Sequence, residues 1–143
     1  MSEICVQDAD FIAQFEDCSL APEHFDHRGH IRLAWLYMNN YGSAVALEKL
    51  VTGIRRYAGS LGANDKFHYT ITAALLKILV YRQIQCQAPD WQIFIKMNSD
   101  LLTDAQALLL RHYRQGVLFS EEARVNWVEP DLIPFSATAL NNR

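Results

Sequence analysis

The stretch Ile71-Thr-Ala-Ala-Leu-Leu-Lys-Ile-Leu-Val-Tyr81 decides the fold class of this chain. It contains residues that also favour strands, but it lies inside a longer helical pattern that starts after a cap at Asn64 or Asp65 and ends near Cys86. A pattern of that length favours a helix over a strand. Because the pattern is apolar on nearly every side, we predict that Lys66 to Cys86 is the central, buried helix of a bundle.

Helix-length segments lie on both sides of this stretch, and turn-forming residues separate them. We expect helices at 8–17, from Pro22 or Asp26 to Tyr41, at 43–60, at 91–97, from Thr103 or Asp104 to Gln115, and briefly after Ser120. No segment alternates apolar and polar residues long enough to indicate a strand. The sequence therefore predicts an all-α fold, a compact bundle of about six helices in a single domain over residues 1–143.

The segment Glu129-Pro-Asp-Leu-Ile-Pro-Phe135 follows the last expected helix. Its two prolines exclude a regular helix, so we expect an extended strap that packs onto the body of the bundle. The side chains expected to be largely buried there are Trp127, Leu132, Ile133 and Phe135. Residues 141–143 are expected to be frayed.

Composition limits the classes of partner. The chain has 143 residues, of which 50% are hydrophobic and 20% charged, as in a globular domain. The formal charge is -3 and the pI about 5.9. Because phosphate binding needs a concentrated basic surface, nucleic acid is not expected as a partner. The three cysteines are odd in number and show no Cys-x-x-Cys spacing, which argues against a disulfide framework and a zinc ribbon.

The sequence shows neither a signal peptide nor an apolar run of membrane-spanning length. Its longest apolar stretch, from Ile71 to Tyr81, is far shorter than the roughly 20 residues that cross a bilayer. We therefore expect a cytoplasmic protein without a membrane partner. The sequence indicates no particular oligomeric state.

Three histidines occupy positions that suggest a shared site. Spacings of three and four place a set of residues on one face of the second expected helix. The set is His27, His30, Ala34, Tyr37 and Tyr41. His68 opens a similar inward face in the first turn of the central helix, with Thr72 one turn deeper. Helix N-termini favour neutral imidazole, which is the form that binds metal. We expect His27, His30 and His68 to converge, whereas His24 and His112 are expected on the surface.

Two stretches resemble an uncharacterised bacterial family, namely Phe25-Asp-His27-Arg-Gly-His30-Ile-Arg-Leu33-Ala34-Trp35 and Lys66-Phe-His68-Tyr-Thr70-Ile-Thr72. In that family the pattern F-x-H-x-x-H-x-x-L-A-W precedes Y-H-E-T-x-T. The stretches 98–102, 118–124 and 129–132 are similar to the same group, so the resemblance covers most of the chain. It implies no activity. One departure concerns Tyr69, which stands where the family pattern has Glu. If that Glu is a ligand or base in the family, either its role is missing here or another carboxylate, such as Glu23 or Asp26, fills it.

The histidines lead first to the hypothesis of a metal-dependent enzyme that acts on a small molecule. His27, His30 and His68 would hold one divalent ion, zinc or iron, with an open coordination position. The metal would act as a Lewis acid or activate water. Asp26 or Glu23 would serve as a fourth ligand or as the general base.

Two further hypotheses need no metal. In one, the chain binds a small anionic ligand at the two helix N-termini, with Arg28, Arg32 and Lys66 nearby. Further side chains, some of them apolar, would line such a pocket, and these are Trp35, Tyr37, Tyr41 and Thr72. In the other, the chain is a helical interaction module without chemistry, which agrees with the lack of a catalytic motif but gives no reason for histidines on buried faces.

Overall fold

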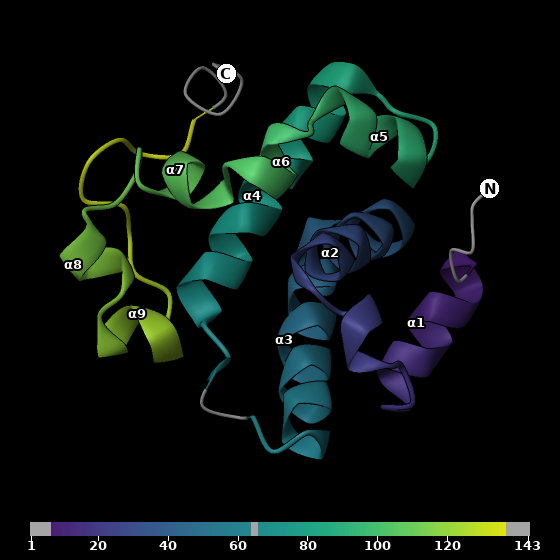
Figure 1. Ribbon diagram of the computed structural model, residues 1–143. Coiled ribbons are helices and arrows are strands. Elements are labelled where there is room, and N and C mark those ends of the chain that lie inside the picture. Colours follow the sequence, from purple (N-terminus) through teal and green to yellow (C-terminus); the bar gives the residue numbers. More distant parts are fainter. Residues whose placement is uncertain (1–6, 64–65, 137–143) are drawn as a thin grey trace.

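The structure is a computed structural model that describes residues 7–63 and 66–136 of the chain (Figure 1). All regular secondary structure within these residues is helical, so the predicted all-α fold is confirmed. In the first half of the chain, the helix boundaries expected from the sequence lie close to those of the structure. Helix α1 covers Asp8–Glu16 and α2 covers His27–Tyr41.

Three long helices form the centre of the molecule: α2, α3 (Ser43–Ser60) and α4 (Tyr69–Cys86). The chain turns from α2 into α3 at Gly42, whose φ of 85° is a left-handed conformation that glycine adopts without strain. Helix α4 contacts α2 and α3 on one side and α5, α7 and α9 on the others (Figure 1). The prediction that this helix is central is confirmed.

Helix α1 and the short 3-10 helix η1 (Pro22–His24) lie against the α2–α3 pair. Phe15 of α1 packs directly onto Gly53 of α3, where an added Cβ would come within 2.6 Å of the phenyl ring. The glycine therefore lets two helices approach closely. Pro22 occupies the start of η1. A backbone N–H at this position has no hydrogen-bond partner within the helix, so its absence in proline loses no hydrogen bond.

The polypeptide after α4 is divided into short helices. They are α5 (Trp91–Met97), α6 (Asp100–Thr103), α7 (Ala105–Leu109), α8 (Gln115–Leu118) and α9 (Glu121–Val125). The single helix expected from Thr103 or Asp104 to Gln115 is therefore wrong.

Hydrogen bonds to a buried arginine explain where α6 begins. The guanidinium of Arg82, which is 1% exposed, donates to both carboxylate oxygens of Asp100 at 3.0 and 2.9 Å and to the side-chain oxygen of Asn98 at 3.0 Å. A charge without water needs such partners, so α6 starts where it can supply them. Farther along, the 110–114 turn places His112 and Tyr113 in the interior.

The strap beyond α9 is held mainly through its backbone. The Leu132 N–H donates to the His112 carbonyl at 2.9 Å, and the imidazole of His112 donates from Nδ1 to the Ile133 carbonyl at 2.7 Å. His112 is 4% exposed and stacks on Phe135, so the expectation that it lies on the surface is wrong. His24 is exposed, as expected.

The expected burial of the strap is only partly observed. Trp127 and Phe135 are half-buried, but Leu132 and Ile133 are each 48% exposed because the backbone bonds turn their side chains outward. Residues 141–143, expected to be frayed, lie outside the described part of the chain.

Candidate functional site

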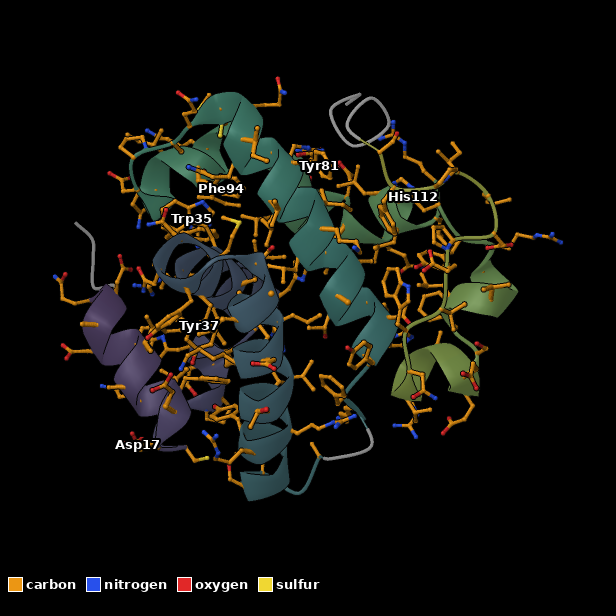
Figure 2. The ribbon with its side chains drawn as sticks, turned by 180° about the vertical axis from the view of Figure 1, so that it is seen from behind. Asp17, Trp35, Tyr37, Tyr81, Phe94 and His112 are labelled. Atoms are coloured by element: carbon orange, nitrogen blue, oxygen red, sulfur yellow. The ribbon has the colours of Figure 1, made fainter. Side chains whose placement is uncertain are left out.

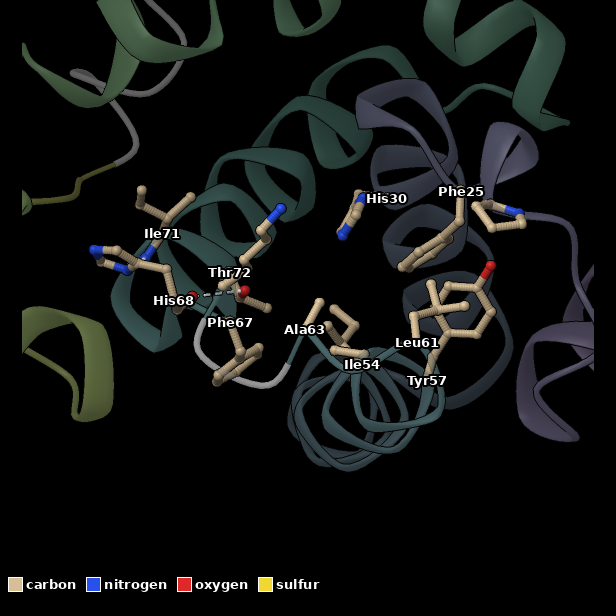
Figure 3. A pocket seen from close by; sticks show the side chains of 13 residues that line it. Phe25, His30, Ile54, Tyr57, Leu61, Ala63, Phe67, His68, Ile71 and Thr72 are labelled. Carbon is tan, nitrogen blue, oxygen red and sulfur yellow. Dashed lines mark hydrogen bonds between the residues drawn. The ribbon is translucent and has the colours of Figure 1, made fainter.

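A cleft opens between the N-terminal ends of α2 and α4 and the middle of α3. It has two adjoining lobes, with volumes of about 400 and 360 Å³. Both lobes share Phe25, His30, Ile54, Ile71 and Thr72. Figure 3 shows the first lobe, with His30 on the α2 side, Ile54 and Tyr57 on the α3 side, and Phe67 and Thr72 near the start of α4. Its walls are largely apolar, and a few polar groups reach its edges.

His30 is the titratable side chain that lines both lobes. Its Nδ1 lies 3.0 Å from the Asp26 carbonyl oxygen, and its ring stacks on Phe25 with centroids 4.0 Å apart. A carbonyl only accepts, so Nδ1 carries the proton and Nε2 keeps its lone pair. Burial lowers the pKa of His30, although the bond to Asp26 opposes this shift. At neutral pH the cleft therefore contains a fixed, uncharged imidazole.

His68 plays a structural role at the start of α4. Because α4 begins at Tyr69, His68 is its N-cap and lies outside the helix rather than in its first turn. Its Nδ1 accepts the Ile71 N–H at 3.1 Å, and its Nε2 donates to the Leu118 carbonyl at 2.8 Å. Figure 3 shows the ring turned away from His30. Burial lowers the pKa of His68, which keeps the capping nitrogen unprotonated. Asn64 and Asp65, expected as caps, lie outside the described residues.

His27 is exposed, so the expectation that it points into the interior is wrong. It is the first residue of α2, and its Nε2 lies 2.8 Å from the Leu101 carbonyl of α6, which holds the ring at the edge of the second lobe. The three histidines are thus fixed by three different backbone carbonyls. Over residues 7–63 and 66–136, no three His, Cys, Asp or Glu side chains are grouped so that they could hold a metal ion.

The two carboxylates considered as bases lie in different surroundings. Asp26 is the N-cap of α2, where its side chain accepts the Gly29 N–H at 2.9 Å, and it lines the second lobe of the cleft. Glu23 is exposed on η1 and does not line the cleft. Thr72 does line both lobes, and its hydroxyl donates to the His68 carbonyl at 2.8 Å.

The other residues expected to bind a ligand lie away from the cleft. Arg32 forms an ion pair with Asp8 at 2.7 Å and lies over Phe11 of α1. Trp35 belongs to the core, where it packs with Phe94 and donates to the Gln83 side chain (Figure 2). Neither Arg32 nor Trp35 therefore lines the cleft with His30.

Tyr37 is also buried, but it faces a different hollow. Its hydroxyl donates to the Glu16 carboxylate, which together with burial raises the pKa of Tyr37. This hollow, with a volume of about 370 Å³, is charged, and its lining includes Lys49 and Arg56. Tyr41 is 48% exposed, so its expected inward position is wrong.

The apolar walls are the part of the site that sequence reasoning missed. Ile54 and Tyr57 belong to the apolar stripe of α3, and Phe25 and Phe67 precede α2 and α4. Each resembles an ordinary core residue in the sequence. Only the way in which α2, α3 and α4 pack together shows that these side chains border a cavity as well as the core.

Lys66 adds a positive charge to the first lobe. It is exposed and forms no ion pair with any residue of the described segments. Arg55 lies close by, with its guanidinium 4.9 Å from the centroid of the Phe67 ring. Lys66 and Arg55 therefore give the rim near the start of α4 two positive charges.

Comparison with known proteins does not assign this chain to a family. No protein-family model matches this sequence, no curated protein is detectably similar to it, and no solved structure matches its fold. The resemblance of the two histidine-containing stretches to a bacterial family stays a prediction. Within the part of the chain that the structure describes, no helix has both the length and the apolarity needed to cross a membrane.

Proposed function

We propose that this protein binds a small, mainly apolar molecule in the cleft between α2, α3 and α4, without a metal ion. The observation that carries the proposal is the fixed imidazole of His30, whose Nε2 faces an apolar cleft and bonds no group among the described residues. Small-molecule sites are typically concave, about 300–1,000 Å³ in volume and mostly apolar, with a few oriented polar groups. The cleft meets each of these criteria.

The walls supply the binding free energy. Phe25, Tyr57 and Phe67 offer aromatic surfaces, and Ile54 and Ile71 offer aliphatic ones. Covering apolar surface yields about 25 cal/mol per Å² before the costs of association. His30 would then orient the ligand, because a fixed polar group in an apolar environment favours a ligand whose own polar group pairs with it.

Within residues 7–63 and 66–136, the metal-dependent alternative lacks a ligand set. His68 uses both ring nitrogens in backbone hydrogen bonds, and His27 is held at its Nε2 by Leu101. A metal bound to all three would have to break the N-cap of α4 or the bond of His68 to the Leu118 carbonyl. The binding proposal requires no such rearrangement.

A fluorescent probe tests the proposal directly. N-phenylnaphthylamine is an uncharged molecule with two aromatic groups, phenyl and naphthyl, and its fluorescence emission rises when it enters an apolar site. We expect saturable binding to the full chain. In Ala58→Phe the new ring enters the first lobe, because Ala58 is half-buried on its lining, and binding should weaken at least about tenfold.

Ala44→Phe is the matched control, since it makes the same change on the same helix. Ala44 is exposed and lines a separate groove between α3 and α4, with a volume of about 330 Å³. The probe should bind this variant as it binds the wild type. Equal binding to wild type and Ala58→Phe, or loss confined to Ala44→Phe, would show that the cleft is not the binding site.

A further inference from the structure

We propose that the natural ligand is an amphipathic acid, an apolar body with one anionic group, and that His30 takes up a proton as this acid binds. This inference rests on the proposed function of the cleft. It adds the chemical class of the ligand and a proton-linked affinity. It concerns one residue, His30, whose two ring nitrogens have different surroundings.

His30 can accept a proton without losing its place. Nδ1 already donates to the Asp26 carbonyl, and an imidazolium keeps this donor. The stack on Phe25 holds the ring plane in both protonation states. Protonation therefore changes only Nε2, which turns from an acceptor into a charged donor inside the cleft. Such a donor pairs with an anionic oxygen more strongly than with a neutral group.

The charges around His30 favour an incoming anion. The titratable and charged groups that line the cleft with it are Asp26 and His27 from the start of α2, Tyr57 from α3, and Lys66 and His68 from the start of α4. Asp26 is the one carboxylate among them, and its side chain caps the Gly29 N–H. Tyr57 donates its hydroxyl to the Leu20 carbonyl, and His68 is held neutral as a cap.

Lys66 is the permanent positive charge of this lining, and Arg55 lies behind the neighbouring Phe67 ring. An acid whose anionic group reaches His30 would thus meet a cationic rim and leave its apolar body against Ile54 and Ile71. An opposite charge within about 4–6 Å raises the pKa of an imidazole. Binding of the anion and uptake of the proton therefore strengthen each other.

Two probes that differ in one group test this inference. Anilinonaphthalene sulfonate is N-phenylnaphthylamine with an added sulfonate, which stays ionised throughout the pH range of proteins. For wild type we expect the dissociation constant of the sulfonate to rise by up to about tenfold per pH unit between the lowered pKa of His30 in the free protein and its raised pKa in the complex, because one proton is bound with the anion over this range. The neutral probe should bind independently of pH. Calorimetry in buffers of different ionisation enthalpy should count close to one proton taken up per sulfonate.

Variants then identify the proton acceptor. In His30→Gln the pH dependence and the proton uptake should vanish, while the neutral probe still binds. His24→Gln is the matched control: it removes an exposed histidine that does not line the cleft and should behave as wild type. If His30→Gln does not fold, the Hε1 resonance of His30 in wild type provides the same readout, because its pKa should rise when the sulfonate is added.

Each of the following results would contradict the inference. Sulfonate binding without pH dependence or proton uptake would show that the ligand need not be an acid. A pH dependence that persists in His30→Gln, or disappears in His24→Gln, would assign the proton elsewhere. Tighter binding of the neutral probe at every pH would point to an uncharged ligand. All three leave the binding cleft intact, whereas the absence of binding by both probes would remove the proposed function itself.

Discussion

The Nε2 atom of His68 donates to the carbonyl oxygen of Leu118 at 2.8 Å and so ties the start of α4 to the end of α8. The same imidazole caps α4 through the Ile71 N–H. One side chain thus ends the loop that follows α3 and anchors the C-terminal third of the protein to the central helix. This explains a histidine at a position where its sequence context suggested a metal ligand.

We predict that His68→Ala lowers the free energy of unfolding by about 2 kcal/mol, because it removes an N-cap and leaves the Leu118 carbonyl without its partner. His68→Asn, which keeps a capping acceptor, should recover part of the loss. Urea unfolding followed by circular dichroism measures both, with the exposed His24→Ala as the control, expected within about 0.5 kcal/mol of wild type. A loss in His68→Ala no larger than the control would show that the cap contributes nothing.

Stability should decrease in mildly acidic solution. Burial lowers the folded pKa values of His30 and His68 below the usual value near 6.5, so the unfolded chain binds more protons in this range. The contribution of both groups is fully present above their unfolded pKa and is lost as the pH falls toward the folded values. Urea unfolding between about pH 7.5 and 5 should show this decrease, and His68→Asn should flatten it. Stability that is constant or rises toward pH 5 would contradict the shifts.

Removing the partner of the buried cation should be costly. Asp100→Ala leaves Arg82 without its carboxylate, and we expect a loss of about 3 kcal/mol, the lower end for a broken buried pair because Asp100 is 28% exposed. Arg114→Ala is the comparison, since it breaks an ion pair with Asp131 whose arginine side chain is 74% exposed. That change should cost about 0–1 kcal/mol. Similar losses in the two variants would mean that Arg82 finds another partner.

The strap should stabilise the domain although two of its apolar residues are exposed. Truncation after Val128 removes the carbonyl partner of His112 and the aromatic contacts of Phe135 with His112 and Trp127. We expect a clear drop in melting temperature, from the loss of about 1–3 kcal/mol for each buried group left unsatisfied. Ile133→Ala should change little, since its side chain is 48% exposed. An unchanged melting temperature after truncation would show that the strap is a loose tail.

The sequence by itself determined the all-α class, the central place of α4 and most helix ends. These features depend on local physics: the apolar period of a helix and caps that join residues three apart. Asp26, which accepts from Gly29, and Ser120, which accepts from Ala123, are two such caps. A hydrogen bond over so short a separation needs no knowledge of the rest of the chain.

Only the tertiary structure decided what the histidines do. The ring of His27 bonds a carbonyl 74 residues away, and that of His68 one 50 residues away. His112 likewise became buried through the strap, at Ile133. A helical period shows which side of a helix a residue occupies, but the partner of a polar side chain depends on which distant backbone group is brought to it. Nε2 of His30 remains available to the cleft because the other ring nitrogen, Nδ1, bonds the carbonyl of Asp26 one turn earlier in the chain.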